Sequence, residues 1–409
     1  MNRIQLFLRN ARLSALLFIL LALLGGNVWA KEFTYTYRAG EKYKSISKVS
    51  EKVYFNGRYS HEADILNRIS FEVSDVEDGT GTLEGRFITT ERLTGSSSAY
   101  KIDNTYESVY KRGPKGEFDI GSEYYMPVVR NVPLFPEGDV EVGDTWTKRG
   151  EEVHDFRRGY GIREPFRIPF TAHYRYLGEE TVDDRLLDVI SVRYNVRHRT
   201  GPYFRRYELY PQRISGFSDK TLYWDNEKGH LYAYHEQFSF HYVLSNGHHY
   251  EFTGYARAKI TESTPMDKDR VADEIDEKIK KEQVPDTRVR VDETGVTIEL
   301  DNIKFAPDSA RLLEEEKEKL DRLAEILRSY PDRHLQITGH TALAGTPGGR
   351  QRLSEQRAQS VAGYLLEKGV REPQEILTEG KGAREPIADN STPEGMRRNR
   401  RVEITILEN

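Results

Sequence analysis

From about residue 32 to residue 261, hydrophobic and polar positions alternate along the chain with a period of two. The run 231–244 shows the pattern clearly, because large apolar residues recur at alternate positions and polar residues lie between them. This period is typical of β-strands with one buried and one solvated face. The buried face of this run is expected to carry Tyr232, Tyr234, Phe238, Phe240, Tyr242 and Leu244.

Short polar segments separate these runs. Residues 225–229 lie between the runs 221–224 and 231–244, and residues 245–247 lie before the run 250–260. Segments of this length and composition join neighbouring antiparallel strands. We therefore predict an antiparallel β-rich N-terminal domain over residues 31–262, built as a sandwich or an open barrel.

A membrane barrel is the alternative for this region. Such a barrel needs an uninterrupted apolar outer band on every strand. In residues 43–55 the more apolar face still contains Ser45, Ser47 and Glu51. The opposite face carries the four lysines Lys42, Lys44, Lys48 and Lys52. The pattern favours a water-soluble periplasmic domain.

Two short motifs in this region invite a functional interpretation. Gly79, Gly81 and Gly85 lie among strand residues with no helix after them, so a hairpin turn fits them better than a phosphate loop. His248 and His249 are adjacent, and adjacent strand residues point to opposite faces and rarely share one metal ion. We expect no metal site and no cofactor. No triad order or paired-acid pattern stands out either, which predicts a non-enzymatic protein.

Residues 263–288 differ in composition and predict a linker with one short helix. Val271, Ile275 and Ile279 recur every four residues and form a narrow apolar stripe. Such a helix leans on a neighbouring element. Pro285 ends it. Charged residues four apart are placed to pair on its exposed side: Glu274 with Lys278, and Glu277 with Lys281.

From Val289 onward, strand and helix patterns follow one another. Short strands are predicted over 296–300, 334–338, 376–378 and 402–407. A helix over 310–330, capped by Asp308 or Ser309, lies between the first two strands. A second helix is marked by Ala358, Val361, Ala362 and Leu365. This β-α-β-α-β-β order predicts an α+β multidomain chain whose last domain, 289–409, has helices on one side of a sheet.

Five sequence blocks occur in order within this last region: NIKFAPDSA, ITGHT, LSEQRAQSVAGYL, EGKGAREPIADNST and EGMRRNRRVEI. With them the region resembles the OmpA-like C-terminal domain of outer-membrane OmpA proteins, peptidoglycan-associated lipoproteins and flagellar stator subunits. The resemblance covers residues 289–406 and does not extend into the β-rich region. It implies non-covalent binding of peptidoglycan through the diaminopimelate of the stem peptide.

The resemblance also implies a ligand pocket, with one departure from the family. The free end of diaminopimelate carries an ammonium and a carboxylate, so the pocket needs one acid and one planar base. In the family the acid follows Gly-His-Thr and the base is the Arg of Leu-Ser-x-x-Arg-Ala. Here the base is Arg357, but the residue after Thr341 is Ala342. The family's separation of 15 positions is kept, so an insertion does not explain the missing acid.

The pocket residues implied by the resemblance are Thr341, Ala342, Arg350, Arg357 and Arg400. Arg350 stands where the family often has Asn, so the site has gained positive charge. We therefore predict altered or weakened ligand recognition. Structural roles remain open for the same residues: Arg357 pairs with Glu355 or another acid, or residues 399–401 brace the last strand against the loops. The loop 342–349 is either a relaxed remnant or a lip over a different ligand.

The first 30 residues predict a cleaved export signal. Arginines precede the apolar run 13–24, and small residues flank Trp29 at the cleavage position. The apolar run is shorter than the roughly 20 residues of a membrane helix. The chain has no cysteine, which excludes disulfides and a lipid-modified cysteine. With 61 basic and 66 acidic residues, it is an unlikely nucleic-acid binder.

Together these features predict a periplasmic protein associated with the outer membrane. Its expected partner is the peptidoglycan stem peptide or another anionic envelope ligand, and outer-membrane proteins are further candidates. The alternative is a structural module of the envelope whose OmpA-like pocket no longer binds peptidoglycan. The sequence leaves the ligand of the β-rich domain and the oligomeric state open.

Overall fold

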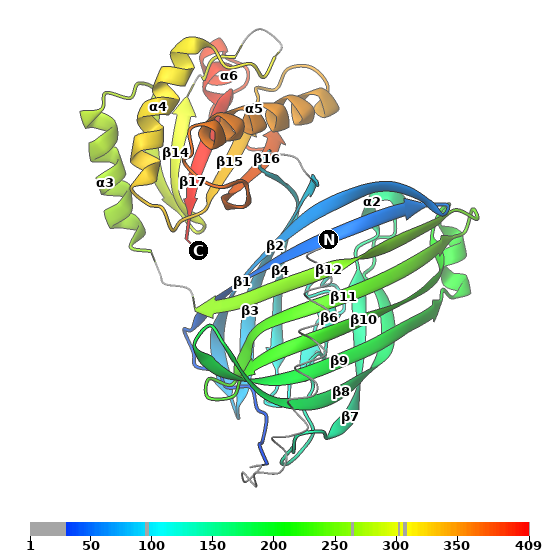
Figure 1. The fold of residues 1–409 in the computed structure, drawn as a ribbon. Helices are drawn as coiled ribbons and strands as arrows, with labels where there is room; N and C mark the ends of the chain where they lie inside the picture. Colours follow the sequence, from blue (N-terminus) through cyan, green and yellow to red (C-terminus); the bar gives the residue numbers. More distant parts are fainter. Residues whose placement is uncertain (1–29, 95–97, 263–265, 302, 306–308, 409) are drawn as a thin grey trace, which may run out of the picture.

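The computed structural model describes residues 30–94, 98–262, 266–301, 303–305 and 309–408. The expected export signal up to residue 29 and the candidate helix cap Asp308 lie outside the described residues. Figure 1 shows two parts, a large curved sheet formed by the first strands and a smaller part that contains helices α3 to α6. We call them the β-rich domain and the C-terminal domain.

Twelve strands of the described chain form the β-rich domain as one continuous antiparallel sheet. Their order across the sheet is β5-β4-β3-β2-β1-β12-β11-β10-β9-β8-β7-β6. The strands are β1 (Lys42–Phe55), β2 (Arg58–Glu77), β3 (Thr80–Leu93), β4 (Tyr100–Arg112), β5 (Phe118–Ile120), β6 (Val129–Arg130), β7 (Thr145–His154), β8 (Phe166–Val182), β9 (Arg185–Arg199), β10 (Pro211–Asp225), β11 (His230–Leu244) and β12 (His249–Glu262). Two short helical turns, α2 (Arg157–Tyr160) and η1 (Pro202–Arg206), interrupt them.

The predicted meander β10-β11-β12 is confirmed. Turns after Asp225 and Leu244 join these strands, and the alternation of burial follows the alternation in sequence. Phe238, Tyr242 and Leu244 of the predicted face are buried, whereas His235 is exposed. Gly79 lies in the hairpin turn between β2, which ends at Glu77, and β3, which begins at Thr80, as predicted; Gly81 and Gly85 lie within β3.

Aromatic residues form the main core of the β-rich domain. The segment before β1 crosses one end of the curved sheet, where Phe33 and Tyr35 are 1% and 4% exposed. The Tyr35 ring lies edge-on to Trp224, with their centroids 4.7 Å apart, and Phe135 meets the same tryptophan. Large aromatic rings bury much apolar area per residue, so this segment stabilises that end of the sheet.

The C-terminal domain has a five-stranded sheet in the order β13-β14-β17-β15-β16. Helices α4 and α5 pack on one of its faces, where Ile298, Ile337 and Ile404 form the core. The elements are α3 (Lys268–Lys281), β13 (Thr287–Asp292), β14 (Gly295–Asp301), α4 (Glu314–Arg328), β15 (Leu335–His340), α5 (Pro347–Glu367), η2 (Pro373–Glu375), β16 (Ile376–Gly382), α6 (Pro393–Asn399) and β17 (Arg401–Leu407).

The structure corrects two predicted elements of this domain. It has one more strand, β13, which begins at Thr287 inside the predicted linker and pairs with β14 along its length. Helix α4 begins at Glu314 instead of residue 310, because the preceding segment is extended and Phe305 forms a β-bridge with Leu312. Ser309 therefore does not cap the helix, and its hydroxyl accepts a bond from the Arg311 N–H instead.

The stripe predicted on α3 is buried against the C-terminal domain. Val271, Ile275 and Ile279 are 4%, 0% and 5% exposed and belong to the core of that domain. The predicted ion pairs of this helix are wrong. Lys278 lies over the Tyr330 ring at 5.1 Å, and the same tyrosine donates to Glu274. The pairs that form are Arg270 with Glu274 and Asp276 with Lys280.

The two domains meet along β4 and β16. These strands pair in parallel over two residues, Leu377 with Tyr100 and Thr378 with Lys101. Leu377 and Leu407 are buried in a small apolar cluster with residues of the β-rich sheet. The contact therefore combines backbone pairing with a small shared core.

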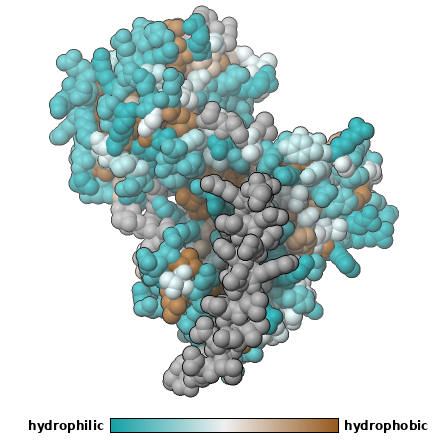
Figure 2. Space-filling model, viewed as in Figure 1, coloured by the Kyte–Doolittle hydropathy of each residue, from teal (hydrophilic) through white to brown (hydrophobic). Residues whose placement is uncertain are grey.

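On the face drawn in Figure 2, the described surface of both domains is mainly hydrophilic, with small separate hydrophobic areas. Within the described chain, no helix combines the length and the apolar character that crossing a bilayer requires.

Candidate functional site

The end of β15 leads directly into the candidate pocket residues. Thr341 and Ala342 are 6% and 4% exposed, and the Thr341 N–H donates to the Gly382 carbonyl at 2.8 Å. The close approach of α5 explains this burial, since a Cβ on Gly339 would lie 2.1 Å from the Ser354 carbonyl oxygen. Position 342 therefore holds a buried methyl group and no acid.

The loop after Ala342 is shorter than the sequence suggested. Thr346 caps α5 by accepting a bond from the Gly349 N–H at 3.1 Å, and Pro347 occupies the first helical turn. Residues 347–349 are thus helical, and the loop proper is 342–346. Asn390 fixes its start, because the Asn390 Oδ1 atom accepts a bond from the Leu343 N–H at 3.0 Å. Leu343 itself is 59% exposed.

Arg350 and Arg357 both project from α5. Arg350 is half-buried and donates to the Gly345 carbonyl at the base of the loop. The guanidinium carbon of Arg357 lies 4.8 Å from the centre of the Phe305 ring, a cation–π distance. Phe305 belongs to the loop after β14, so Arg357 faces that loop.

The structure shows Lys101 and Gln351, and not Arg357, as the partners of Glu355. Glu355 accepts bonds from Lys101 at 2.8 Å and from Gln351 at 2.7 Å. Although burial by itself raises the pKa of Glu355, these two partners and the Lys101 charge hold it below its usual value. Glu355 thus points toward the β-rich domain.

Arg400 lies exposed at the C-terminal end of α6, while its two neighbours brace the preceding loop. The Asn399 side chain is buried, accepts bonds from the N–H groups of Ile387 and Ala388 at 2.8 and 3.0 Å, and donates to the Ala388 carbonyl. Arg401 donates to the Glu385 carbonyl at 3.2 Å. The bracing role considered for residues 399–401 therefore belongs to Asn399 and Arg401.

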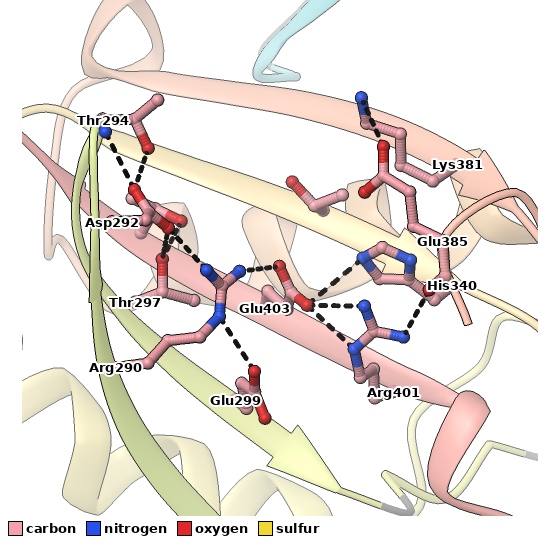
Figure 3. Close-up of polar contacts among 12 residues, drawn as sticks. Arg290, Asp292, Thr294, Thr297, Glu299, His340, Lys381, Glu385, Arg401 and Glu403 are labelled. Atoms are coloured by element: carbon pink, nitrogen blue, oxygen red, sulfur yellow. Dashed lines mark hydrogen bonds and ion pairs between the residues drawn. The ribbon is translucent and has the colours of Figure 1, made fainter. Parts of the chain in front are cut away.

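Sequence reasoning missed a buried ionic network on the sheet face opposite α4 and α5 (Figure 3). Glu403 of β17 is its centre. It meets Arg290 of β13 at 2.9 Å, Arg401 at 2.7 Å and the Nε2 atom of His340 at 3.5 Å. Burial alone raises the pKa of Glu403, but His340, Arg401 and Arg290 outweigh it and lower the pKa to about 2.

Arg290 extends this network to the edge of the sheet. Its guanidinium also contacts Glu299 at 2.9 Å and Asp292 at 2.7 Å (Figure 3). His340 is 1% exposed at the other end of the network. Since His340 directly precedes Thr341, the network fixes the point where the chain leaves β15 for the candidate pocket. The alternation Arg401-Val402-Glu403-Ile404 was the signal in the sequence, because it places two charges on one strand face.

Residues 304–400 match the OmpA family. The C-terminal domain is an OmpA family domain. The match begins after β14 and ends at Arg400, so it contains all the candidate pocket residues and none of the β-rich domain.

Relatives of the OmpA domain include named envelope proteins. "Peptidoglycan-binding protein ArfA" of Mycobacterium tuberculosis is 44% identical over 104 residues, which are 25% of this chain and 32% of that protein. "Outer membrane protein A" of Bordetella avium is 44% identical over 103 residues, which are 25% of this chain and 53% of that protein. The chain thus spans about a third to a half of the length of these relatives.

Among solved structures, the OmpA domain is similar to the cell wall anchor of the T6SS from Pseudomonas aeruginosa. The sequence identity is 30%, the coverage is 34% of this chain and 99% of that chain, and the TM-score is 0.29.

The candidate pocket residues of the OmpA domain can bind an anionic group through their positive charge. Arg350, Arg357 and Arg400 supply guanidinium groups, and Ala342 supplies no acid. In the part of the chain that the structure describes, no cluster of three or more His, Asp or Glu side chains is arranged to hold a metal ion.

Proposed function

We propose that the OmpA domain attaches this protein non-covalently to peptidoglycan, with ligand recognition altered by Ala342. The similarity to a protein named for peptidoglycan binding, at 44% identity over 104 residues, carries the proposal. The family and these relatives are also consistent with a non-enzymatic role in the cell envelope.

The geometry around α5 supports an anion-binding pocket. Arg357 is half-buried and held against Phe305, so its guanidinium is positioned before a ligand arrives. A planar guanidinium suits a carboxylate, because it can form two parallel hydrogen bonds. We therefore propose that Arg357 binds the carboxylate of the stem peptide and that Arg350 and Arg400 add positive charge.

The loss of the acid is expected to weaken recognition of an ammonium group. Removing one member of a hydrogen-bonded charge pair costs about 2–5 kcal/mol, which is roughly thirtyfold to several thousandfold in affinity. Ala342 is also buried, at 4% exposure, so it does not merely shorten an exposed side chain. The proposed pocket thus binds the anionic part of its ligand and does not bind the cationic part.

In this proposal the export signal delivers the chain to the periplasm. The OmpA domain then holds the wall, and the β-rich domain faces the outer membrane or a protein bound to it. Outer-membrane or envelope proteins among the relatives support this location.

Cosedimentation of the chain from residue 31 onward with purified peptidoglycan sacculi tests the proposal. We expect saturable binding that Arg357→Ala reduces at least tenfold. Arg270→Ala, on the exposed side of α3, is the matched control and should bind like the unmodified chain. Equal binding by all three proteins would contradict the assigned role of Arg357.

The variant Ala342→Asp separates the proposal from its alternative. If the unmodified chain does not bind and Ala342→Asp does, the pocket is a remnant, and the domain serves as a structural or protein-interaction module of the envelope. If both bind, and Ala342→Asp binds more tightly, the pocket works in the present chain with reduced affinity, as proposed.

A further inference from the structure

A large half-open cavity lies on the concave face of the β-rich sheet, and we call it the inner cavity. Its volume is about 700 Å³, and strands β1 to β4 and β10 to β12 contribute to its wall together with the segment around Met126 and Pro127. Small-molecule sites in proteins commonly measure roughly 300–1,000 Å³. The inner cavity is therefore large enough for an organic ligand.

The sequence keeps this space open with small side chains. On the concave face of β1, Ser45 and Ser47 are 6% and 4% exposed, and Ala258 pairs opposite Ser47 on β12. The neighbouring strand β11 carries large rings at the corresponding positions, such as Tyr234 and Phe238. A leucine or phenylalanine at Ser47 would fill the space, so the cavity follows from residue choice and not from the curvature of the sheet alone.

Most of the wall is apolar. Phe71 and Phe87 line it from β2 and β3, Tyr106 from β4, and Leu222 and Tyr234 from the other side. Aromatic and aliphatic walls favour a ligand with an apolar body, because its burial removes apolar surface from water.

Two acids, Glu51 and Glu91, are exceptions in this largely apolar wall. They project from the concave faces of β1 and β3, and β2 lies between them, where Glu51 is paired with Ala63 and Glu91 with Ile65. Glu51 is half-buried, whereas Glu91 is exposed, so Glu91 lies at the opening and Glu51 further inside. Burial, together with the charge of Glu91, raises the pKa of Glu51 to about 7.

The other acids of the concave face have partners. Glu236 meets Lys220 at 2.8 Å, and Glu152 accepts bonds from Tyr194 at 2.7 Å and from His154 at 2.9 Å. Among the described residues, Glu51 and Glu91 have neither an ion-pair nor a hydrogen-bond partner. Two neighbouring carboxylates without a counter-charge are unfavourable in an apolar cavity, and a bound cation would remove that cost.

The remaining charged groups around the inner cavity do not supply this cation. Lys220 is committed to Glu236, and Arg112 donates to the Tyr37 hydroxyl at 2.5 Å and stacks over Tyr35. Arg68, the third cation of the wall, contacts the Nδ1 atom of His334 in the C-terminal domain. Near the opening, Asp103 pairs with Arg158, and Asp155 pairs with Arg157. Charge complementarity therefore points to a positive group from outside the chain.

We propose that the inner cavity binds a small amphiphile with a cationic head, such as a long-chain amine or quaternary ammonium. The head lies between Glu51 and Glu91, and the apolar body lies against Phe71, Phe87 and Tyr106. This site is in the β-rich domain and does not depend on peptidoglycan binding by the OmpA domain.

Titration calorimetry of the chain from residue 31 onward tests this proposal with four probes, each below its critical micelle concentration. Dodecyltrimethylammonium is expected to bind saturably at one site, and dodecyl sulfate at least tenfold more weakly. Dodecyl maltoside, which has the same tail and no charge, should fall between them. Tetramethylammonium, which has the head without the tail, should bind much more weakly than dodecyltrimethylammonium.

Glu51→Gln is expected to weaken dodecyltrimethylammonium binding tenfold or more and to change dodecyl maltoside binding by less than twofold. Glu84→Gln, an exposed acid on the opposite face of β3, is the matched control and should leave both affinities unchanged. Ser47→Phe fills the cavity and should abolish binding of both probes. Circular dichroism checks that each variant is folded.

Three results would overturn the proposal. They are equal affinities for the three dodecyl probes, an effect of Glu51→Gln no larger than that of Glu84→Gln, and undiminished binding by Ser47→Phe. If Glu51→Gln fails to fold, the comparison of the probes on the unmodified chain still decides between a cationic amphiphile and any apolar ligand.

Discussion

Glu403 in the C-terminal domain and Glu51 in the β-rich domain are the same residue type in opposite surroundings. Both lie on a sheet face and both are shielded from water. Glu403 is met by two arginines and His340, and its pKa falls to about 2. Glu51 is met by another acid at a distance, and its pKa rises to about 7.

The difference teaches how to tell a structural acid from one that awaits a ligand. When a buried carboxylate has its full set of hydrogen-bond donors, these donors stabilise its ionised form, and the carboxylate holds them in place. A shielded carboxylate without donors makes the ionised form unfavourable, and a protein keeps such a group where a ligand supplies the missing charge. Five predictions compare the two acids and the two domains that contain them, ordered from the largest expected effect to the smallest.

Glu403→Gln should destabilise the C-terminal domain by about 3–5 kcal/mol, because it leaves Arg401, whose side chain is 3% exposed, without its acid. Far-UV circular dichroism during urea unfolding follows this domain, which contains the long helices. Glu325→Gln, an exposed acid of α4, is the control and should change the free energy of unfolding by less than about 0.5 kcal/mol.

The same acid predicts a pH dependence. The pKa of Glu403 is lower in the folded state than the ordinary value of 4.5, so its contribution is present above that value and is lost as the pH falls toward about 2. The contribution at pH 7 is about 3 kcal/mol. If the unmodified chain and Glu403→Gln lost the same free energy of unfolding between pH 6 and pH 3, the result would contradict this account.

Ile275→Ala tests whether α3 is part of the C-terminal domain. Ile275 is 0% exposed in the core of that domain, and its truncation should cost about 2–5 kcal/mol. In the described chain both tryptophans, Trp146 and Trp224, lie in the β-rich domain, so their fluorescence reports that domain separately. We expect a loss in the helical signal and little change in fluorescence, whereas Val291→Ala, at an exposed position of β13, should change neither.

Glu51→Gln should act in the opposite direction to Glu403→Gln. The pKa of Glu51 is higher in the folded state than the ordinary value, so ionisation weakens the folded state as the pH rises from 4.5 through about 7. At pH 8 the glutamine variant should be more stable by about 1–2 kcal/mol. Tryptophan fluorescence at pH 4 and pH 8 measures the difference, which should nearly vanish at pH 4, below the ordinary pKa.

The weakest expected effect concerns the contact between the domains. Lys101 and Glu355 form an ion pair of 2.8 Å across it, and the Lys101 side chain is 50% exposed. A double-mutant cycle with Lys101→Ala and Glu355→Ala should give a coupling of about 0.2–1 kcal/mol. A coupling near zero at 0.5 M salt and a measurable one at low salt would fit an exposed pair.

Much of the fold could be predicted from the sequence, because local patterns determine it. The alternation in residues 231–244 predicts β11 and its buried face, and the spacing of Val271, Ile275 and Ile279 predicts the buried face of α3. The start of α4 could not be predicted, since it depends on the bridge between Phe305 and Leu312, which lie in an otherwise irregular segment.

The candidate sites show the same limit. Five motif blocks are enough to locate the candidate pocket residues of the OmpA domain along the chain. The network around Glu403 joins residues from four strands, β13, β14, β15 and β17. Arg290 and Glu403 are 113 positions apart, and the local alternation around Glu403 does not reveal such distant partners. The inner cavity depends on small residues facing large ones across strands, and this pairing is visible only once the register is known.

The parallel pairing of β4 with β16 has a mechanical consequence. The seam is only two residues long, whereas β3 and β4 pair over more than ten. Under tension between the two domains, the seam is therefore expected to separate before the strands behind it. The chain still joins the domains between β12 and α3, so the load then enters the β-rich sheet at β12.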